Sequence, residues 1–301
     1  MISHDRHVIA ADGTRIAYGV AGDGPVLALT NGLTTSVFFW THLYPRWIQR
    51  FTVITWDLKG HGDSEPARSA AGTTIPALAD DLRRVLDDAG VDQAIHVGFS
   101  MGSQVIFELY RQAPERVLAL VPLLGTYQRV LDTALGPLGK IAGAALRVTP
   151  RPLVQASGGL FRRLVRTSAA QGVGRRLKLI GPEVTPEDLD LYVQHFGRVH
   201  LPTIAAMTLA AQAHSAADLL PTITAPVLVI GGGEDVFAPA DRVAVPMQRL
   251  IPGAERLHLE RGTHTSLFEH PDAIDAAIVE FLERRALLPR ERSSAGSGAP
   301  R

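Results

Sequence analysis

The segment Gly98-Phe99-Ser100-Met101-Gly102 follows a G-x-S-x-G pattern, which is typical of a nucleophilic serine on a sharp turn. The apolar run from Ala94 to Phe99 predicts a strand before the turn, and apolar residues at helical spacing follow it. Such a turn presses the strand and helix backbones together, so the positions two before and two after the serine must lack side chains. Gly98 and Gly102 meet this requirement. A glycine-rich packing turn is the alternative interpretation.

In this context the sequence resembles the α/β-hydrolase family, over about Val8 to Leu282 with one inserted stretch excepted. The resemblance implies that an acid and then a histidine follow the nucleophile along the chain. The segment from Gly232 to Pro239 is similar to the family's G-x-x-D-x-x-x-P acid loop and matches Asp235 to the acid. The segment Arg261-Gly262-Thr263-His264-Thr265-Ser266 matches His264 to the histidine.

The chemistry explains why three such residues are needed. A serine hydroxyl is a poor nucleophile until a neutral imidazole accepts its proton, and a buried carboxylate must orient that imidazole and stabilise its charged form. The resemblance assigns these roles to Ser100, His264 and Asp235. Glu234 and Asp241 are nearby carboxylates, and each is a surface charge in the simpler interpretation.

Acyl transfer also needs hydrogen-bond donors for the developing oxyanion. The resemblance implies the backbone N–H of Met101 as one donor. The second comes from the loop Asn31-Gly32-Leu33-Thr34, where many relatives have His-Gly, and we expect it to be the N–H of Leu33. An ordinary turn is the alternative. Phe38, Phe39 and Trp40 follow this loop and either line an acyl pocket or are simply buried.

A second stretch, Asp57-Leu58-Lys59-Gly60-His61-Gly62-Asp63-Ser64, resembles the family's D-x-R-G-x-G-x-S sequence, with Lys59 in place of the usual arginine. Its role in the family is mainly structural. We therefore take it as evidence for the fold and not as part of the active site.

The elements that must position these residues alternate between apolar strand-like runs and helical periods, which predicts βα units and a mostly parallel sheet. An antiparallel hairpin is expected over residues 7–20, and helices with one apolar face are expected at residues 75–89 and from Pro271 onward. The expected fold is therefore α/β: a mostly parallel, twisted sheet of the eight-stranded type, flanked by helices, with an inserted helical cap. The predicted parallel strands are Val26–Thr30, Phe51–Trp56, Ala94–Phe99, Val117–Leu123, Val227–Ile230 and Arg256–Leu259.

Strand signals stop after Tyr127, where a stretch rich in Leu, Ala, Gly and Arg begins. We expect the core to comprise residues 1–127 and 201–287, the cap residues 128–200, and a disordered tail residues 288–301. Between Arg129 and Lys178 there are ten Arg or Lys residues and one acid, Asp132. The basic part of this stretch is either a lid that touches lipid or attracts an anionic substrate, or a cap helix with a solvated outer face.

Composition narrows the class of protein. The 301 residues are 46% hydrophobic and carry 30 basic and 30 acidic residues, so the chain folds and has no global field that would attract nucleic acid. The absence of cysteine excludes thiol nucleophiles and disulfides. The eleven histidines show no compact ligand spacing, so we expect no metal, and no nucleotide-binding glycine pattern predicts a cofactor. With no signal peptide and no long apolar run, a cytoplasmic protein without stable membrane insertion is expected.

The sequence thus predicts a serine hydrolase that cleaves carboxylic esters, thioesters or lactones through an acyl-serine intermediate. The same triad could serve acyl transfer, perhydrolysis or C–C bond hydrolysis, or a ligand sensor with slow turnover. Haloalkane dehalogenases and epoxide hydrolases of the family use aspartate at the position of Ser100, which disfavours those activities. The substrate is expected to be a small molecule, and the sequence leaves the oligomeric state open.

Overall fold

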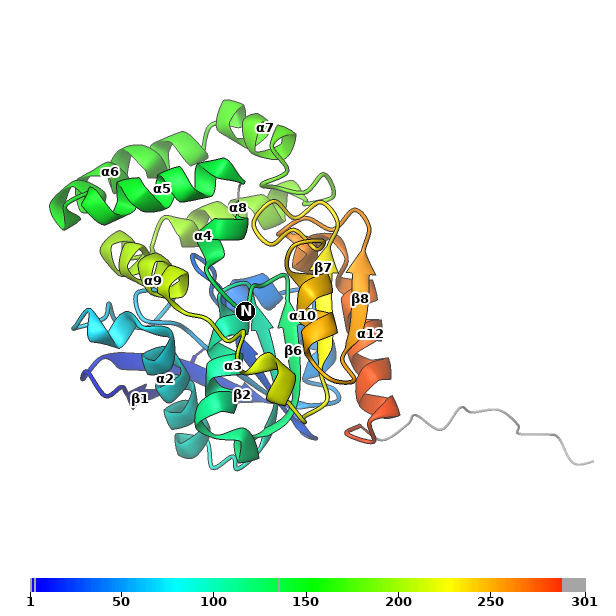
Figure 1. The fold of residues 1–301 in the computed structure, drawn as a ribbon. Helices are drawn as coiled ribbons and strands as arrows, with labels where there is room; N and C mark the ends of the chain where they lie inside the picture. The colour runs from blue at the N-terminus through cyan, green and yellow to red at the C-terminus, as the bar shows by residue number, and fades with distance from the viewer. Residues whose placement is uncertain (1, 3, 135, 289–301) are drawn as a thin grey trace, which may run out of the picture.

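The computed structural model describes residue 2, residues 4–134 and residues 136–288 (Figure 1). It contains one sheet of eight strands in the order β1-β2-β4-β3-β5-β6-β7-β8. β1 pairs antiparallel with β2, and β2 pairs antiparallel with β4, whereas every later neighbour pair is parallel. The predicted eight-stranded, mostly parallel sheet is therefore confirmed. The strands are β1 (Arg6–Ile9), β2 (Arg15–Ala21), β3 (Val26–Thr30), β4 (Thr52–Trp56), β5 (Ala94–Phe99), β6 (Val117–Leu123), β7 (Leu228–Gly232) and β8 (Glu255–Leu259).

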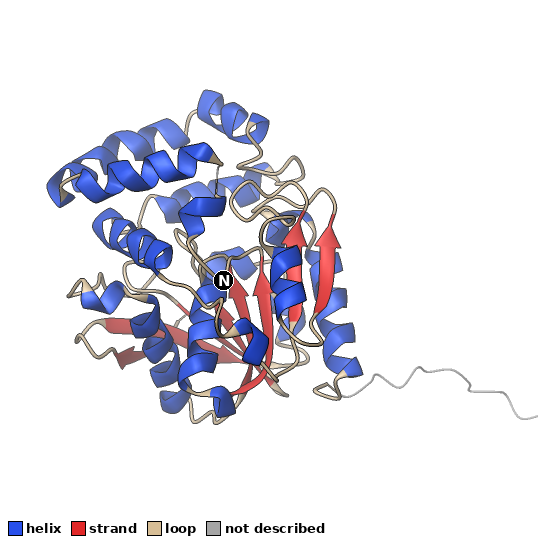
Figure 2. Ribbon diagram, viewed as in Figure 1, coloured by secondary structure: helices blue, strands red, loops and turns tan. Residues whose placement is uncertain are grey.

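Helices cover both faces of this sheet, as Figure 2 shows. Apolar residues of α2, α3 and α10 form one buried cluster with one sheet face, and residues of α1, α11 and α12 form a second cluster with the other face. Both faces of the parallel strands are thus removed from water, which explains their nearly unbroken apolar sequences. The helices around the sheet are α1 (Tyr44–Trp47), α2 (Ile75–Asp88), α3 (Gly102–Gln112), α10 (Ala244–Leu250), α11 (Ser266–Glu269) and α12 (Pro271–Arg284).

The two helices with the clearest sequence signals form as predicted. In α2 the side chain of Thr74 accepts a hydrogen bond from the N–H of Ala77, which is an N-cap contact. In α12 the first helical residue is Pro271, and Ile274 and Ile278 are fully buried. Their apolar faces anchor the helices on opposite sides of the sheet.

A layer of helices lies over the carboxyl ends of the parallel strands (Figure 1). It begins after β6 and includes α9, which packs against α4, α5 and α6, so helical structure continues past the cap boundary that we expected at residue 200. The division into core and cap stays a prediction. The helices of this layer, called here the cap layer, are α4 (Val130–Thr133), α5 (Pro137–Val148), α6 (Arg151–Val165), α7 (Ser168–Arg176), α8 (Pro186–Phe196) and α9 (Leu201–Ala213).

Two further expectations concern the chain end and the membrane. Leu288 is buried, and residues 289–301 of the expected tail lie outside the described residues. Within the described part of the chain, no helix has the length and apolar character needed to cross a bilayer.

Candidate active site

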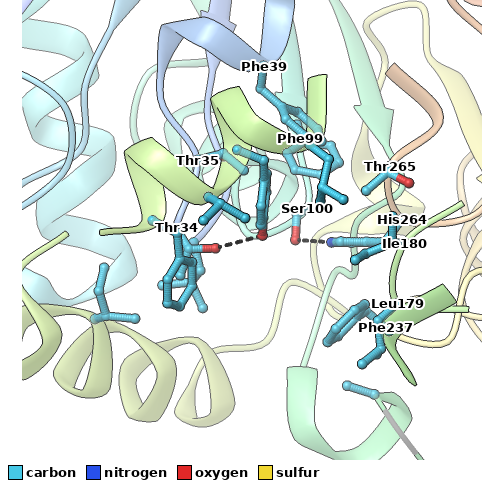
Figure 3. A pocket seen from close by; sticks show the side chains of 18 of the residues that line it. Thr34, Thr35, Phe39, Phe99, Ser100, Leu179, Ile180, Phe237, His264 and Thr265 are labelled. Carbon is cyan, nitrogen blue, oxygen red and sulfur yellow. Dashed lines mark hydrogen bonds between the residues drawn. The ribbon is translucent and has the colours of Figure 1, made fainter. Parts of the chain in front are cut away.

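Ser100 lies on the turn between β5 and α3 with a φ of 54°, a left-handed conformation that is strained for a residue with a side chain. The flanking glycines allow this turn. A Cβ atom on Gly98 would lie 2.5 Å from the carbonyl oxygen of Gly102, and one on Gly102 would lie 2.5 Å from that of Thr30. The turn therefore has the crowded geometry that the sequence pattern predicts, and the Ser100 side chain faces a cavity beneath the layer of helices after β6 (Figure 3).

Ser100, His264 and Asp235 come together at the carboxyl edge of the sheet. His264 Nε2 lies 2.9 Å from Ser100 Oγ, and His264 Nδ1 lies 2.8 Å from Asp235 Oδ2. The rings of Phe99 and Phe237 lie against the imidazole, with centroids 5.0 Å and 4.9 Å away. These rings shield the imidazole from water, so its two hydrogen bonds lie in a medium of low polarity.

The Asp235 side chain is fully buried, and each of its carboxylate oxygens has a hydrogen-bond partner. Its Oδ1 accepts hydrogen bonds from the N–H groups of Phe237 and Ala238, at 2.8 Å and 3.0 Å. The two alternative carboxylates lie elsewhere: Glu234 forms an ion pair with Lys178 at 3.2 Å, and Asp241 is exposed. Asp235 is the one of the three that contacts His264.

The N–H groups of Leu33 and Met101 are both without a hydrogen-bond partner among the described residues. Gly32 lets the Leu33 loop approach Ser100 closely, because a Cβ atom on Gly32 would lie 2.7 Å from Ser100 Cβ. Two free amides beside a serine hydroxyl have the donor arrangement that an oxyanion would need. Asn31, which stands where many relatives have histidine, fixes this loop by donating to the Trp56 carbonyl oxygen at 2.8 Å.

Thr34 adds a polar group to the same loop. Its φ is 64°, and its N–H donates to Nε2 of His61 at 2.9 Å. Burial lowers the pKa of His61, so the imidazole is neutral and can accept this bond. The Thr34 hydroxyl lies 3.3 Å from the hydroxyl of Tyr192 in α8, a contact drawn in Figure 3. The loop from Asn31 to Thr34 is thus braced by His61 of the core and by Tyr192 of α8.

A cavity of about 460 Å³ opens above Ser100, between the sheet edge and helices α4, α7, α8 and α9. No lysine, arginine, aspartate or glutamate is among the described residues that line it. Aliphatic and aromatic side chains make most of the wall, including Leu131, Ile180 and Phe196. The cavity therefore fits an uncharged, largely apolar group.

The three aromatic residues expected in the pocket have different positions. Phe39 lines the cavity, whereas Phe38 and Trp40 do not. Residues 37–40 form a short 3₁₀ helix, which turns successive side chains in different directions. Phe38 stacks on the ring of His195 with a centroid distance of 4.2 Å, and Trp40 Nε1 donates to the side chain of Asn31 at 2.8 Å.

Several lining residues were missed by sequence reasoning. Phe237 and Thr265 are sequence neighbours of Asp235 and His264, so their positions in the motifs could have indicated them. Tyr192 lies in α8, where nothing in the spacing marks one residue as facing the cavity that Ser100 lines.

The Asp57–Ser64 stretch lies away from the cavity lining and supports the loops beneath it. Lys59 is buried between Asp12 and Asp81, with Nζ–O distances of 3.3 Å and 2.9 Å. Burial raises the pKa of Asp81 to about 6, although Lys59 opposes the shift.

One trio of possible metal ligands occurs in the described part of the chain: His4, Asp57 and Asp63. His4 Nδ1 and the Asp63 N–H both contact Oδ2 of Asp57, at 3.0 Å and 2.9 Å. These hydrogen bonds account for the grouping.

A family model described as the alpha/beta hydrolase fold matches residues 25–271, which is most of the chain. The chain belongs to the α/β-hydrolase family. The family expected from the sequence motifs is therefore confirmed.

Relatives of this α/β hydrolase cover nearly the whole chain. An uncharacterized protein of Mycobacterium tuberculosis is 27% identical over 283 residues, which are 90% of this chain and 78% of that protein. Bifunctional epoxide hydrolase 2 of Mus musculus is 23% identical over 317 residues, which are 96% of this chain and 57% of that protein.

Solved structures agree with the fold. An esterase from Exiguobacterium antarcticum superposes with a TM-score of 0.76 at 18% identity, over 92% of this α/β hydrolase and 98% of that chain. Est816, described as an N-acyl homoserine lactone degrading enzyme, superposes with a TM-score of 0.71 at 26% identity, over 92% and 100% of the two chains. Hydrolases with different substrates thus share this architecture, so the residues around Ser100 must carry the functional argument.

Proposed function

We propose that this α/β hydrolase cleaves carboxylic esters, including thioesters and lactones, through a covalent acyl-serine intermediate. The observation that carries the proposal is the continuous chain of hydrogen bonds from Ser100 Oγ through His264 to Asp235, at 2.9 Å and 2.8 Å. At its Ser100 end, this chain of hydrogen bonds reaches the apolar cavity, because the half-buried Ser100 on its strained turn lines the cavity wall.

In the acylation step, His264 Nε2 accepts the proton of Ser100 as Ser100 Oγ attacks the ester carbonyl carbon. Asp235 stabilises the imidazolium that forms, since its carboxylate contacts Nδ1. The tetrahedral intermediate places its oxyanion at the N–H groups of Leu33 and Met101. The intermediate then collapses, the C–O bond to the alcohol breaks, and His264 donates its proton to the leaving alcohol.

Deacylation repeats these steps with water as the nucleophile. His264 accepts a proton from water, the hydroxide adds to the acyl carbonyl, and the same two amides stabilise the second oxyanion. Collapse of this intermediate releases the carboxylic acid and returns the proton to Ser100 Oγ. Every proton taken up by His264 is given back within one turnover.

The serine nucleophile argues against epoxide hydrolysis, the activity in the name of the murine relative. Attack of a serine oxygen on an epoxide carbon would form an ether, which has no carbonyl group for water to attack. An aspartate nucleophile would instead form an ester, which water can hydrolyse. Ser100 at this position therefore favours substrates that already contain an acyl carbonyl.

The cavity suggests the substrate class. Its uncharged wall and volume of about 460 Å³ favour a neutral ester with an apolar chain. The Thr34 and Tyr192 hydroxyl groups form a polar spot on this wall and could bind a neutral polar group beside the scissile ester. An N-acyl homoserine lactone, the substrate named for Est816, combines an ester, an amide and an apolar chain, and we include this class in the proposal.

The test is turnover of a panel of p-nitrophenyl esters of increasing chain length, with acyl lactones and thioesters in parallel, by the full chain and by Ser100→Ala. The proposal expects a maximum at medium chain length and no turnover by Ser100→Ala. Three other products would point to a different reaction of the same triad. New esters formed with added alcohol would indicate acyl transfer, peracid formed with peroxide would indicate perhydrolysis, and cleavage of a β-diketone would indicate C–C bond hydrolysis. Turnover below a few per hour on every ester, together with a ligand-induced rise in Tm, would favour a sensor.

A further inference from the structure

Exposed apolar side chains gather on the outside of the cap layer. Among the described residues, seven of the nine large apolar side chains that are exposed lie between residues 138 and 177. Soluble monomers rarely expose apolar residues in such a concentration without a binding role. The seven belong to α5, α6 and α7 or directly follow α7: Leu138, Ile141, Val148, Leu153, Leu164, Val173 and Leu177.

Helix α5 shows the pattern most clearly, because three of its four large apolar residues are exposed, only Leu146 is half-buried, and its two glycines face inward. Gly139 and Gly143 are buried, and Cβ atoms there would meet the Ala134 carbonyl oxygen and the Leu131 side chain. Leu138, Ile141 and Val148 lie along the opposite side and are 66%, 63% and 80% exposed. A helix that packs only against protein buries its large apolar residues, so this outer face is built for another partner.

The same surface is cationic. Residues 129–178 contain ten Arg or Lys residues and one acid; of the ten, Arg175 donates to backbone carbonyl oxygens and Lys178 pairs with Glu234, so these two add no free charge to the outer surface. Lys140 and Arg147 flank the apolar stripe of α5 and are exposed, and neither has an ion-pair partner among the described residues. Arg163, Arg166 and Arg176 are exposed in the same layer. Apolar residues bordered by Lys and Arg are the signature of a helix that lies in the interface of an anionic membrane.

Helix α7 has residues both in the cavity wall and on the exposed outer side of the cap layer. In α7, Ala170, Gln171 and Gly174 line the cavity, whereas Val173 and the following Leu177 point to solvent. Figure 1 shows α5, α6 and α7 on the side of the molecule farthest from the sheet, with α8 and α9 beneath them. Helix α7 therefore contributes both to the cavity wall and to the outer surface.

We propose that the outer face of α5, α6 and α7, called here the cap face, docks peripherally on an anionic lipid surface. The exposed apolar side chains enter the headgroup region, and the basic side chains contact lipid phosphates. A second copy of the chain fits this face poorly, because it would bring two strongly basic surfaces together. Docking places the cavity next to lipid, where apolar esters concentrate.

The absence of cysteine allows a direct test on the full-length chain. Ile141→Cys places a single nitrobenzoxadiazole dye on the cap face, and Ile9→Cys places the same dye on an exposed apolar site of the edge strand β1. Both variants also carry Ser100→Ala, so that no reaction complicates the signal. Vesicles contain equal parts phosphatidylglycerol and phosphatidylcholine, or phosphatidylcholine alone.

The proposal expects a blue shift of the dye at position 141 with the anionic vesicles, and none at position 9. It also expects Lys140→Gln and Arg147→Gln each to weaken vesicle partitioning about fivefold. Arg249→Gln, an exposed cation of α10 outside the cap layer, should change nothing. High salt should weaken binding because it screens the charges.

Three results would overturn the proposal. One is the absence of vesicle binding at low salt, and another is a blue shift at position 9 equal to that at position 141. The third is a dimer in light scattering that Ile141→Glu converts to a monomer, because a second copy would then cover the cap face. Since binding is measured in a Ser100→Ala background, the outcome is independent of whether the protein cleaves esters.

Discussion

His264 Nδ1 contacts the Asp235 carboxylate and His264 Nε2 contacts the Ser100 hydroxyl. Of these two contacts, the one with Asp235 is held more firmly. The Asp235 side chain is fully buried and also accepts two backbone hydrogen bonds, from Phe237 and Ala238. The carboxylate therefore cannot turn away without leaving two amides unpaired inside the protein. This rigidity gives the imidazole one orientation, with Nε2 toward Ser100.

Asp235→Asn should lower kcat by about 10⁴, because an amide no longer stabilises the imidazolium or selects its tautomer. Ester turnover and the unfolding midpoint are measured together. The matched control is Glu234→Gln, which should leave kcat unchanged since the Glu234 carboxylate pairs with Lys178. If Asp235→Asn keeps more than a tenth of the wild-type activity and the double variant Asp235→Asn, Glu234→Gln loses it, then Glu234 has taken over the role of Asp235.

Gly32→Ala should reduce kcat by about 10²–10³ while the fold is kept, which is the typical cost of one oxyanion donor. The new Cβ atom would lie 2.7 Å from Ser100 Cβ and would push the Leu33 loop away. Gly172→Ala in α7 is the control, because no heavy atom lies within 4 Å of its Cβ position. Equal kcat values for the two variants would remove Leu33 from the oxyanion site.

Tyr192→Phe should lower kcat/KM about tenfold for an N-acyl homoserine lactone, the typical effect of one lost hydrogen bond. A γ-alkyl lactone of similar length has no amide and should react equally well with both proteins. Thr34→Ser keeps the hydroxyl that contacts Tyr192 and is the conservative control. An equal loss on the two lactones would mean that Tyr192 only holds α8 in place.

Stability should fall as the pH decreases from about 6.5 toward 4, on the order of 3 kcal/mol from His96 alone. Burial lowers the pKa of His96 from 6.5 to about 4, so in this window the unfolded chain binds a proton that the folded protein does not. Denaturant unfolding at several pH values measures the slope. His96→Asn should remove this contribution. If the slope of unfolding free energy against pH is unchanged in this variant, a group other than His96 takes up the proton.

Asp81 changes the free energy of unfolding with pH in the direction opposite to His96, so a variant of Asp81 provides a second test. Burial raises its pKa from 3.8 to about 6, so it stabilises the fold below pH 3.8 and loses this contribution as the pH rises toward 6. Asp81→Asn should therefore steepen the acid-side slope, whereas His96→Asn should flatten it. The two variants distinguish the two groups by sign.

The sequence predicted well what short-range pattern determines. β3, β5 and β6 have the predicted bounds, because apolar runs buried on both faces begin and end sharply. The turn at Ser100 was also predictable, since only glycine fits two residues before and after it. Each of these features depends on neighbours within a few residues.

What the sequence did not predict depends on packing between distant segments. Phe38 and Trp40 turn away from the cavity because residues 37–40 form a 3₁₀ helix, which no periodicity indicated. Tyr192 meets Thr34 from 158 residues away in the chain, through the docking of α8 on the core. The outward face of α5 likewise depends on the packing of Gly139 and Gly143 against Ala134 and Leu131, which the helical spacing does not indicate.

The most direct test of the account is covalent labelling of the full chain with a fluorophosphonate, followed by mass spectrometry of the labelled peptide. The account predicts one modified residue, Ser100, with labelling lost in Ser100→Ala, strongly slowed in His264→Ala and retained in Ser103→Ala, whose hydroxyl bonds the Gly98 carbonyl oxygen. Labelling of Ser100→Ala at the wild-type rate, or modification of a different serine, would contradict it.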